Sequence, residues 1–199
     1  KIFLEIVRRL PDNDITIETD ASFMTTITCE KSKFNIIGKS GEDFSYLPNI
    51  EKLDSIMISQ FTLKEIIRQT IFSIADNDNN KLMTGELFEV NEDKLKVVSL
   101  DGHRISIRKV TMKNSYPKKR VVVPGKTLNE VSKILPGDSD QDVTIFFTDK
   151  HIVFEFAQTT VVSRLIEGEY FNIDQMLSSD YETKVRIHKQ ELLSSIDRA

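Results

Sequence analysis

The residues of this 199-residue chain that could carry out chemistry are few, and most stand alone. His103, His151 and His188 are far apart, and none has the spacing to a second ligand that a zinc motif needs. The strongest candidate for acid–base chemistry is the segment LDGHRIS, in which Asp101 stands two residues before His103. A histidine beside a carboxylate can act as a general base, so a hydrolase that uses this pair is one hypothesis for the function.

The same segment also has the sequence of a hairpin turn. Asp101-Gly102 lies between two runs of alternating apolar and polar residues, LKVVSL and ISIRKV. Asp-Gly is favoured at the turn of a β-hairpin, because both turn positions take positive φ. We therefore interpret Asp101 and Gly102 as a turn rather than as part of a catalytic site.

The rest of the sequence offers no second catalytic motif. It has neither a glycine-rich phosphate loop nor a nucleophile elbow. Four aspartates lie in polar stretches without the spacing of a calcium-binding loop: Asp76, Asp78, Asp140 and Asp142. We expect no enzyme activity, no bound metal and no cofactor.

Composition limits the class of protein further. The single cysteine, Cys29, excludes a disulfide framework and is expected to be a small buried residue in a reducing, intracellular setting. The formal net charge of −4 argues against a polycation that binds nucleic acid through its overall charge. The chain starts KIFLEIVRRL, without an initiator Met or signal peptide, and no run is apolar enough for a membrane helix. We expect it to come from inside a longer protein.

An internal repeat organises the chain. The segment VRRLPDNDITIETD resembles VSKILPGDSDQDVTIFFTD, with Ile17 and Ile145 128 positions apart. GEDF at 41–44 matches GEYF at 168–171, and FTLKEIIRQTIFSIA resembles IHKQELLSSIDRA, with Glu65 and Glu191 126 positions apart and each followed by two aliphatic residues. Three pairs at nearly one spacing indicate repeated structural units.

The repeat predicts the domain boundaries. Residues 1–53 are the end of a first unit, residues 54–181 a complete middle unit, and residues 182–199 the start of a third. The same spacing predicts roughly 70 further residues before this chain and about 110 after it.

The middle unit reads as a mixture of helices and antiparallel strands. Residues 61–75 have helical apolar spacing, and Thr62 with Glu65 predicts a capping box. Residues 84–100 read as two strands joined by a turn at 91–93, followed by the Asp-Gly hairpin. A strand near residues 119–126, a helix over 126–135 and three short strands up to residue 168 complete an α+β unit with antiparallel sheets.

Both predicted helices have a basic outer face. Lys64 and Arg68 are four residues apart on the first, and Lys126, Glu130 and Lys133 share a face of the second. Residues 102–126 contain eight Lys or Arg and no acid. Basic faces without interspersed aromatic residues suit contact with phosphates rather than base reading or single-strand stacking.

Four segments carry a resemblance to a known family: LDGHRIS, VVVPGKTLNEVSKIL, SRLIEGEYF and LLSSIDRA. They resemble the bacterial DNA polymerase III beta subunit, the sliding clamp. The resemblance covers essentially the whole chain and implies a clamp fold of repeated α+β domains. Two protomers of three domains each would form a cytoplasmic, non-enzymatic ring around duplex DNA, with helices lining the hole and sheets outside.

The resemblance also assigns roles to residues. Those expected to face the DNA, independently of its sequence, are Lys64, Arg68, Lys126 and Lys133. Short linear peptides of the replicative polymerase, the clamp loader and repair proteins would dock on Met83, Gly102, His103, Arg104, Ile105 and, more weakly, Met176. The homodimer contact would include Ile6, Leu10, Lys31 and Lys33.

Three residues near the expected peptide site depart from the family pattern. Leu100 stands where the family usually has Thr, Phe171 where it has Pro, and Ile173 where it has Tyr. Peptide preference is therefore expected to differ from that of relatives. Three hypotheses remain open at this point: a clamp that encircles DNA, an enzyme that uses Asp101 and His103, and a peptide-binding adaptor that never encircles DNA.

Overall fold

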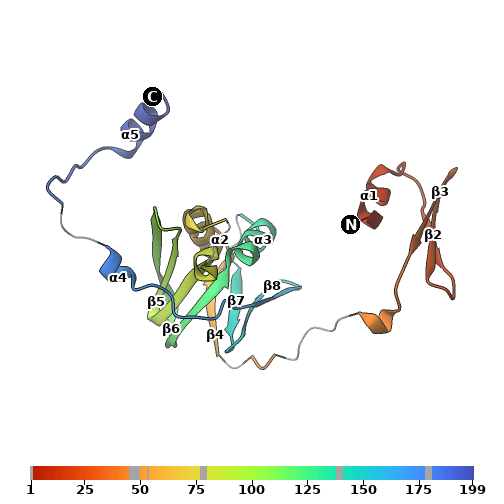
Figure 1. Cartoon of the computed structure of the whole chain (residues 1–199), viewed down its shortest axis with the longest axis horizontal. Coiled ribbons are helices and arrows are strands. Elements are labelled where there is room, and N and C mark those ends of the chain that lie inside the picture. The colour runs from red at the N-terminus through yellow and green to blue at the C-terminus, as the bar shows by residue number, and fades with distance from the viewer. Residues whose placement is uncertain (1, 45–49, 53, 77–79, 138–140, 178–180) are drawn as a thin grey trace. The chain divides into compact units, whose positions relative to one another are not determined.

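The computed structural model describes residues 2–44, 50–52, 54–76, 80–137, 141–177 and 181–199 (Figure 1). The chain divides into two compact units, Lys1–Asn49 (unit 1) and Ile50–Ala199 (unit 2). The predicted boundary at Leu53, and Asp78 and Asp140 among the aspartates considered as metal ligands, lie outside the described residues.

Unit 2 contains a four-stranded antiparallel sheet in the order β4-β7-β8-β9. Its strands are β4 (Asp54–Ser59), β7 (Asp142–Phe147), β8 (His151–Phe156) and β9 (Thr159–Arg164). Ile56 pairs with Ile145 and Ile145 with Phe154, so three apolar side chains meet across neighbouring strands. All three are buried, as the alternating apolar pattern of a half-buried sheet requires.

The helices α2 (Gln60–Thr70) and α3 (Gly125–Ile134) lie side by side and pack on the sheets (Figure 1). Their apolar faces contribute Leu63, Ile66, Ile67, Leu128 and Val131 to the main hydrophobic core. Two serine hydroxyls, one buried and one partly buried, attach the C-terminal end of α2 to the strands. Ser99 Oγ donates to the Thr70 carbonyl at 2.6 Å, and Ser106 Oγ donates to the Gln69 carbonyl at 2.7 Å.

The start of α2 differs from the prediction. Ser59 is the N-cap, and its Oγ accepts a hydrogen bond from the Thr62 main-chain N at 3.2 Å. The predicted capping box of Thr62 and Glu65 is therefore wrong, because the serine three residues earlier already satisfies the free N–H of the first turn. Glu65 is left available for a different contact.

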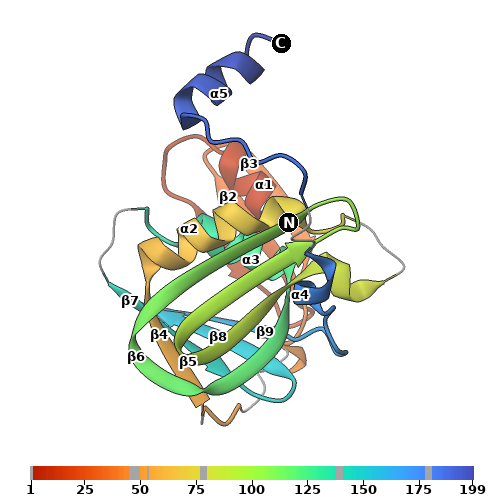
Figure 2. The same ribbon diagram turned by 90° about the vertical axis from the view of Figure 1, so that its left-hand side faces the viewer.

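Two long strands, β5 (Gly85–Leu100) and β6 (Ile105–Pro124), pair with each other and curve across the unit (Figure 2). The predicted turn at 91–93 corresponds to an irregularity within β5, where the pairing shifts on both sides of Glu92 and Glu92 has φ of 53°. The strand is therefore continuous rather than two strands. Both of its halves contribute to the same two hydrophobic clusters.

Unit 1 consists of α1 (Ile2–Arg9) and a three-stranded antiparallel sheet with a short 3-10 helix, η1 (Gly41–Asp43), after it. The strands are β1 (Thr16–Thr19), β2 (Met24–Cys29) and β3 (Ser32–Ile37). Cys29 is buried in β2, which confirms the expectation of a small core residue.

Two short helices follow β9: α4 (Ile173–Met176) and α5 (Lys189–Ile196). Helix α5 buries none of its residues. A third structural unit beginning at residue 182 stays a prediction. Over the described ranges, no helix is long and apolar enough to span a membrane.

Candidate functional site

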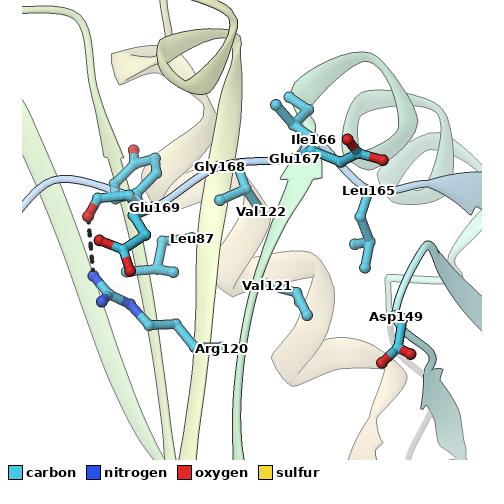
Figure 3. Close-up of a pocket in the computed structure, with 11 residues that line it drawn as sticks. Leu87, Arg120, Val121, Val122, Asp149, Leu165, Ile166, Glu167, Gly168 and Glu169 are labelled. Atoms are coloured by element: carbon cyan, nitrogen blue, oxygen red, sulfur yellow. Dashed lines mark hydrogen bonds between the residues drawn. The ribbon is translucent and has the colours of Figure 1, made fainter.

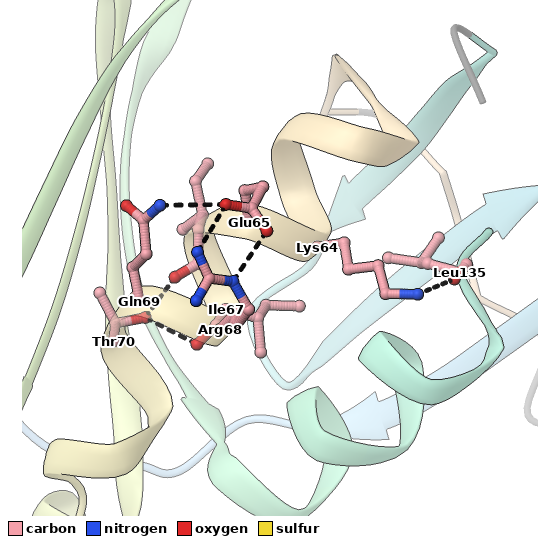
Figure 4. A network of polar contacts seen from close by, with 8 residues as sticks. Lys64, Glu65, Ile67, Arg68, Gln69, Thr70 and Leu135 are labelled. Atoms are coloured by element: carbon pink, nitrogen blue, oxygen red, sulfur yellow. Dashed lines mark hydrogen bonds and ion pairs between the residues drawn. The ribbon is translucent and has the colours of Figure 1, made fainter. Parts of the chain in front are cut away.

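The predicted phosphate-contacting residue Lys64 is half-buried and has an internal partner. Its Nζ donates a hydrogen bond of 2.7 Å to the carbonyl of Leu135, the residue that ends α3 (Figure 4). A helix leaves its last carbonyls without intrahelical donors, so a lysine supplied by a neighbouring helix satisfies one of them. Lys64 therefore joins α2 to α3.

Arg68 is exposed, and its guanidinium holds a carboxylate of the same helix. Its Nε and Nη2 donate to Glu65 Oε1 and Oε2, both at 2.8 Å, and Gln69 Nε2 donates to Oε2 at 3.1 Å (Figure 4). The hydrogen bond from Arg68 is the main reason that the pKa of Glu65 is lowered. The pair is a bidentate fork of the kind that arginine also forms with phosphate.

On α3, the exposed residue Lys133 is paired in the same way. Its Nζ donates to Glu130 Oε1 at 2.8 Å, again from three positions later in the helix. Lys126 is exposed at the start of α3 and, in the described part of the chain, has no ion pair. The four predicted cations thus lie on two packed helices, and they differ in whether a carbonyl or carboxylate of the protein already binds them.

The loop of residues 101–104 is built around one carboxylate. Asp101 accepts hydrogen bonds from the main-chain N of His103 and of Arg104, both at 3.1 Å, and from Arg104 Nε at 2.9 Å. These bonds, the one from the His103 N first, lower the pKa of Asp101. Gly102 has φ of 87° and strands β5 and β6 meet at Leu100 and Ile105, which confirms the predicted hairpin.

The loop differs in detail from the predicted turn, and its contacts do not support the hypothesis that Asp101 and His103 form a catalytic pair. It has four residues between the paired positions, and only Gly102 among them takes positive φ. The Asp101 carboxylate binds the main chain of His103 rather than its ring. It therefore stabilises the loop and does not orient the imidazole as a general base needs.

A second hydrophobic cluster lies next to this loop. Its buried members are Leu87, Val98, Leu100, Val122, Tyr170 and Ile173, and partly buried residues around it include Met83, Ile105 and Phe171. Met83 and Ile105 are thus at the edge of the cluster, whereas Gly102, His103 and Arg104 are exposed on the loop. Met176 lies at the end of α4, 47% exposed, and does not join the cluster.

The three departures from the family pattern have different environments. Leu100 is fully buried and Ile173 nearly so, and both therefore fill the interior of the cluster. Phe171 is partly buried and meets the ring of Tyr170 edge to face at 5.5 Å. Only Phe171 among the three is placed to change the surface that a ligand would meet.

Sequence reasoning missed several residues near this cluster. Arg104 lies 5.9 Å from the ring centroid of Phe72, an exposed residue just beyond α2, so the ring and Asp101 together orient the guanidinium. In the predicted helix, Phe72 falls outside the apolar face, and an aromatic residue at such a position could have indicated an exposed contact.

Arg120 is the second missed residue, and it holds the segment that covers the cluster. Its Nη2 donates to the carbonyls of Tyr170 and Phe171, both at 3.4 Å, and the Ile166 N donates to the Val122 carbonyl at 2.9 Å. Arg120 and Glu169 line one end of a pocket whose other end is lined by Leu165 and Asp149 (Figure 3). Arg120 appeared in the sequence only as one member of a basic run.

Glu86 is the third missed residue and is completely buried in β5. Neither of its carboxylate oxygens has a hydrogen-bond partner among the described residues, and burial raises its pKa to about 8. The Thr70 hydroxyl opposes this rise in pKa, but it donates to the Ile66 carbonyl at 2.8 Å. The alternation of GELFEV, which puts Glu86 on the same side as Phe88 and Val90, could have indicated its burial.

The residues expected at the dimer contact lie in unit 1. Ile6 is half-buried in α1, Leu10 follows that helix, and Lys31 and Lys33 are exposed at and just after the β2–β3 turn. In the described ranges, no three His, Cys, Asp or Glu side chains come together as a metal site. Asp142, which was considered as a ligand, lies 3.8 Å from Lys113 Nζ.

The described residues thus form an α+β arrangement in which two adjacent helices carry cations and an apolar cluster lies beside an exposed loop. Comparison with known proteins identifies the family. The model of the DNA polymerase III beta subunit central domain matches residues 57–172, and that of its N-terminal domain matches residues 1–48. The chain belongs to the DNA polymerase III beta subunit family.

Individual relatives agree with this assignment. The beta sliding clamps of Staphylococcus epidermidis and Staphylococcus aureus are 32% identical over 199 residues, which is all of this chain and 52% of each relative. The chain therefore spans about half the length of the curated relatives it matches.

Solved structures are similar over the same range. A putative DNA polymerase III beta subunit from Eubacterium rectale is 76% identical with a TM-score of 0.88, covering 100% of this chain and 54% of that one. The Bacillus subtilis sliding clamp is 33% identical, also with a TM-score of 0.88, covering 100% and 52%. A Pseudomonas aeruginosa clamp bound to griselimycin is 25% identical with a TM-score of 0.83, covering 99% and 53%. The clamp fold predicted from the sequence is confirmed.

Proposed function

We propose that this chain is part of a DNA sliding clamp, a non-enzymatic ring that encircles double-stranded DNA in the bacterial cytoplasm. It would tether the replicative polymerase, the clamp loader and repair proteins for processive replication. The family assignment supports the proposal, and the observation that carries it is the pair of packed helices in unit 2 on which Lys64, Arg68, Lys126 and Lys133 lie, all but Lys64 exposed.

The charge distribution suits a protein that holds DNA without stopping on it. Lys and Arg side chains attract phosphates of any sequence, and the attraction weakens with salt. A chain with net charge −4 confines that attraction to local patches. Retention on DNA would then come from closure of the ring rather than from tight contacts.

The DNA contact can be tested in the full-length protein with Lys126→Glu combined with Lys133→Glu. Loss of the Lys126 contact and of the weaker Lys133 contact should make the dependence of log affinity on log salt less steep by about 0.9 to 1.8 per protomer and shorten retention on nicked circular DNA. Lys109→Glu with Lys150→Glu, which changes two exposed lysines that are not part of α2 or α3, is the matched control. Equal slopes for the two double variants would contradict the role of α3.

Partner docking is proposed at the second hydrophobic cluster and the loop of residues 101–104. Met83 and Ile105 offer apolar contact at the cluster edge, and Arg104 is held exposed by Asp101 and Phe72. A short peptide in a groove needs soft apolar walls and a few oriented polar groups. Gly102, His103 and Met176 are the remaining proposed contacts.

The docking site can be tested with griselimycin, the compound bound in the Pseudomonas aeruginosa clamp. In the full-length protein, Met83→Ala with Arg104→Ala should weaken its binding about tenfold or more, because both an apolar contact and an oriented cation are lost. Met57→Ala with Arg164→Ala, at exposed positions elsewhere in unit 2, is the control. The same dissociation constant for wild type and the Met83/Arg104 variant would remove this site.

The proposed homodimer uses Ile6, Leu10, Lys31 and Lys33 of unit 1. Native mass spectrometry of the full-length protein measures the assembly directly. A monomer that is not retained on circular DNA would support the adaptor hypothesis instead of the clamp. A hydrolytic activity that disappears in His103→Ala would support the enzyme hypothesis.

A further inference from the structure

Three of the four cations on α2 and α3 are already bound within unit 2. Lys64 is bound to the Leu135 carbonyl, Arg68 to Glu65, and Lys133 to Glu130. The two carboxylate–cation pairs have the same geometry. In each, the acid lies three residues before the cation on the same helix, and the closest contact is 2.8 Å.

These ion pairs contribute little to holding the fold together. Both cations are 66% exposed in their side chains, and ion pairs of such exposure are screened by water and salt. The helices are instead fixed by the apolar core and by the hydroxyl bonds at the end of α2. The role of the two glutamates is therefore not mainly to stabilise the fold.

Their position makes them competitors for any anion that approaches. A phosphate that contacts Arg68 finds the Nε and one Nη2 hydrogen already donated to Glu65, so it is left with the remaining guanidinium N–H groups, and it meets the repulsion of that carboxylate at close range. Glu65 is itself held by Gln69, so it does not swing away freely. The same holds for Lys133, whose Nζ binds Glu130.

We propose that Glu65 and Glu130 are attenuating residues, which weaken the contact between this helix surface and the DNA backbone. This inference rests on the proposed clamp function. Each acid cancels much of the charge of its partner, so a phosphate gains little from any one position, and the ring passes from phosphate to phosphate at low cost. Lys126, without an ion pair among the described residues, supplies the unattenuated attraction.

The experiment compares Glu65→Gln and Glu130→Gln in the full-length protein, with double-stranded DNA as the ligand. Each substitution frees one cation per protomer, and each freed cation that contacts a phosphate should steepen the slope of log affinity against log salt by about 0.9. Between about 50 and 200 mM salt, each such contact therefore adds roughly a threefold loss of affinity. Glu92→Gln, at an exposed residue in the irregularity of β5, makes the same change of net charge away from the helices.

A double-mutant cycle separates attenuation from a general effect of charge. If Glu65 acts through Arg68, then Glu65→Gln should have no added effect when Arg68→Gln is already present, and likewise for Glu130 with Lys133. Additive effects, or effects equal to those of Glu92→Gln, would overturn the inference while the clamp function stands. A wild-type protein that is not retained on circular DNA would overturn the proposed function itself, and this one with it.

Discussion

The two units of this chain contain the same repeated three-stranded sheet, but the two copies differ in how far their apolar side chains are buried. Strands β1-β2-β3 of unit 1 and β7-β8-β9 of unit 2 are both consecutive antiparallel strands. Even the turn after the middle strand is the same, since Glu30 and Ala157, 127 positions apart, have φ of 50° and 49°. The local backbone is thus encoded by each copy of the sequence independently.

Equivalent side chains of the two units differ in burial although their backbones are alike. Ile17 in β1 is 51% exposed, whereas Ile145, its repeat partner in β7, is fully buried. Helix α1 buries none of its residues, whereas α3 buries Leu128 and Val131. In unit 2, strand β4 pairs with β7 and helix α2 packs beside α3, and the described residues of unit 1 include neither counterpart. Among the described residues, unit 1 therefore has the repeated strands and turn but not the helix and strand that cover the equivalent side chains in unit 2.

The largest expected difference between the units concerns this repeat pair of isoleucines. Ile145→Ala leaves a cavity in the main core and should lower the free energy of unfolding of unit 2 by about 2–5 kcal/mol. In this 199-residue chain, Ile17→Ala, the matched control, should change the free energy of unfolding of unit 1 by less than about 0.5 kcal/mol, because half of the side chain is already exposed to water. Hydrogen exchange followed by mass spectrometry resolves the two units in one chain. Equal losses in both units would show that Ile17 is covered in solution.

A second difference is that unit 2 buries a carboxyl group. Burial raises the pKa of Glu86 from 4.5 to about 8. The pKa of Tyr170 is also raised, first by burial and then by the nearby Glu86 carboxylate. The folded protein therefore keeps the proton on Glu86 up to about pH 8, whereas the unfolded chain loses it near pH 4.5. Folding takes up a proton between these values, so the stability of unit 2 should fall as pH rises through this window and level off above it.

Glu86→Gln tests this dependence. The amide cannot ionise, so the variant should be more stable than wild type at pH 8 by on the order of 4 kcal/mol, with the advantage shrinking towards pH 4.5. Glu18→Gln, on the exposed strand β1, should leave the pH dependence unchanged. Urea unfolding from pH 5 to pH 9 measures both. Parallel pH profiles for wild type and Glu86→Gln would mean that Glu86 finds a partner in solution.

The sequence predicted the features that depend on local pattern. The hairpin at residues 101–104, the second helix of unit 2 and the three strands after it are confirmed, because turn residues and apolar spacing act over a few neighbours. The capping box was wrong because the helix starts earlier than predicted: Ser59 is the N-cap, and its Oγ accepts the Thr62 N–H that the Glu65 side chain would have bound. The continuous course of β5 through Glu92 depends on its pairing with β6, which lies up to 39 residues away in the chain.

Features of the site that depend on packing were not visible. Lys64 looked like a free surface cation, but it reaches the Leu135 carbonyl 71 residues away. The pairs Glu65–Arg68 and Glu130–Lys133 have helical spacing that the sequence does show, although it does not say which cations remain free for a ligand. Arg120 and Phe72 gain their contacts only when the segment after β9 and the loop of residues 101–104 come together with them.

The smallest difference concerns the repeated glycines of GEDF and GEYF. Gly168 has φ of 129°, and a Cβ there would meet the Leu82 side chain at 3.3 Å, whereas a Cβ on Gly41 would meet nothing within 4 Å. Gly168→Ala should therefore cost about 1–2 kcal/mol, because alanine strains the backbone at that φ and crowds Leu82. Gly41→Ala should stabilise unit 1 by about 0.5 kcal/mol, since alanine restricts the unfolded chain and strains nothing in the folded one. Hydrogen exchange in each unit measures both signs. A loss of stability in unit 1 equal to that in unit 2 would mean that GEDF adopts the conformation of GEYF in solution, and that the difference between the units is limited to the core.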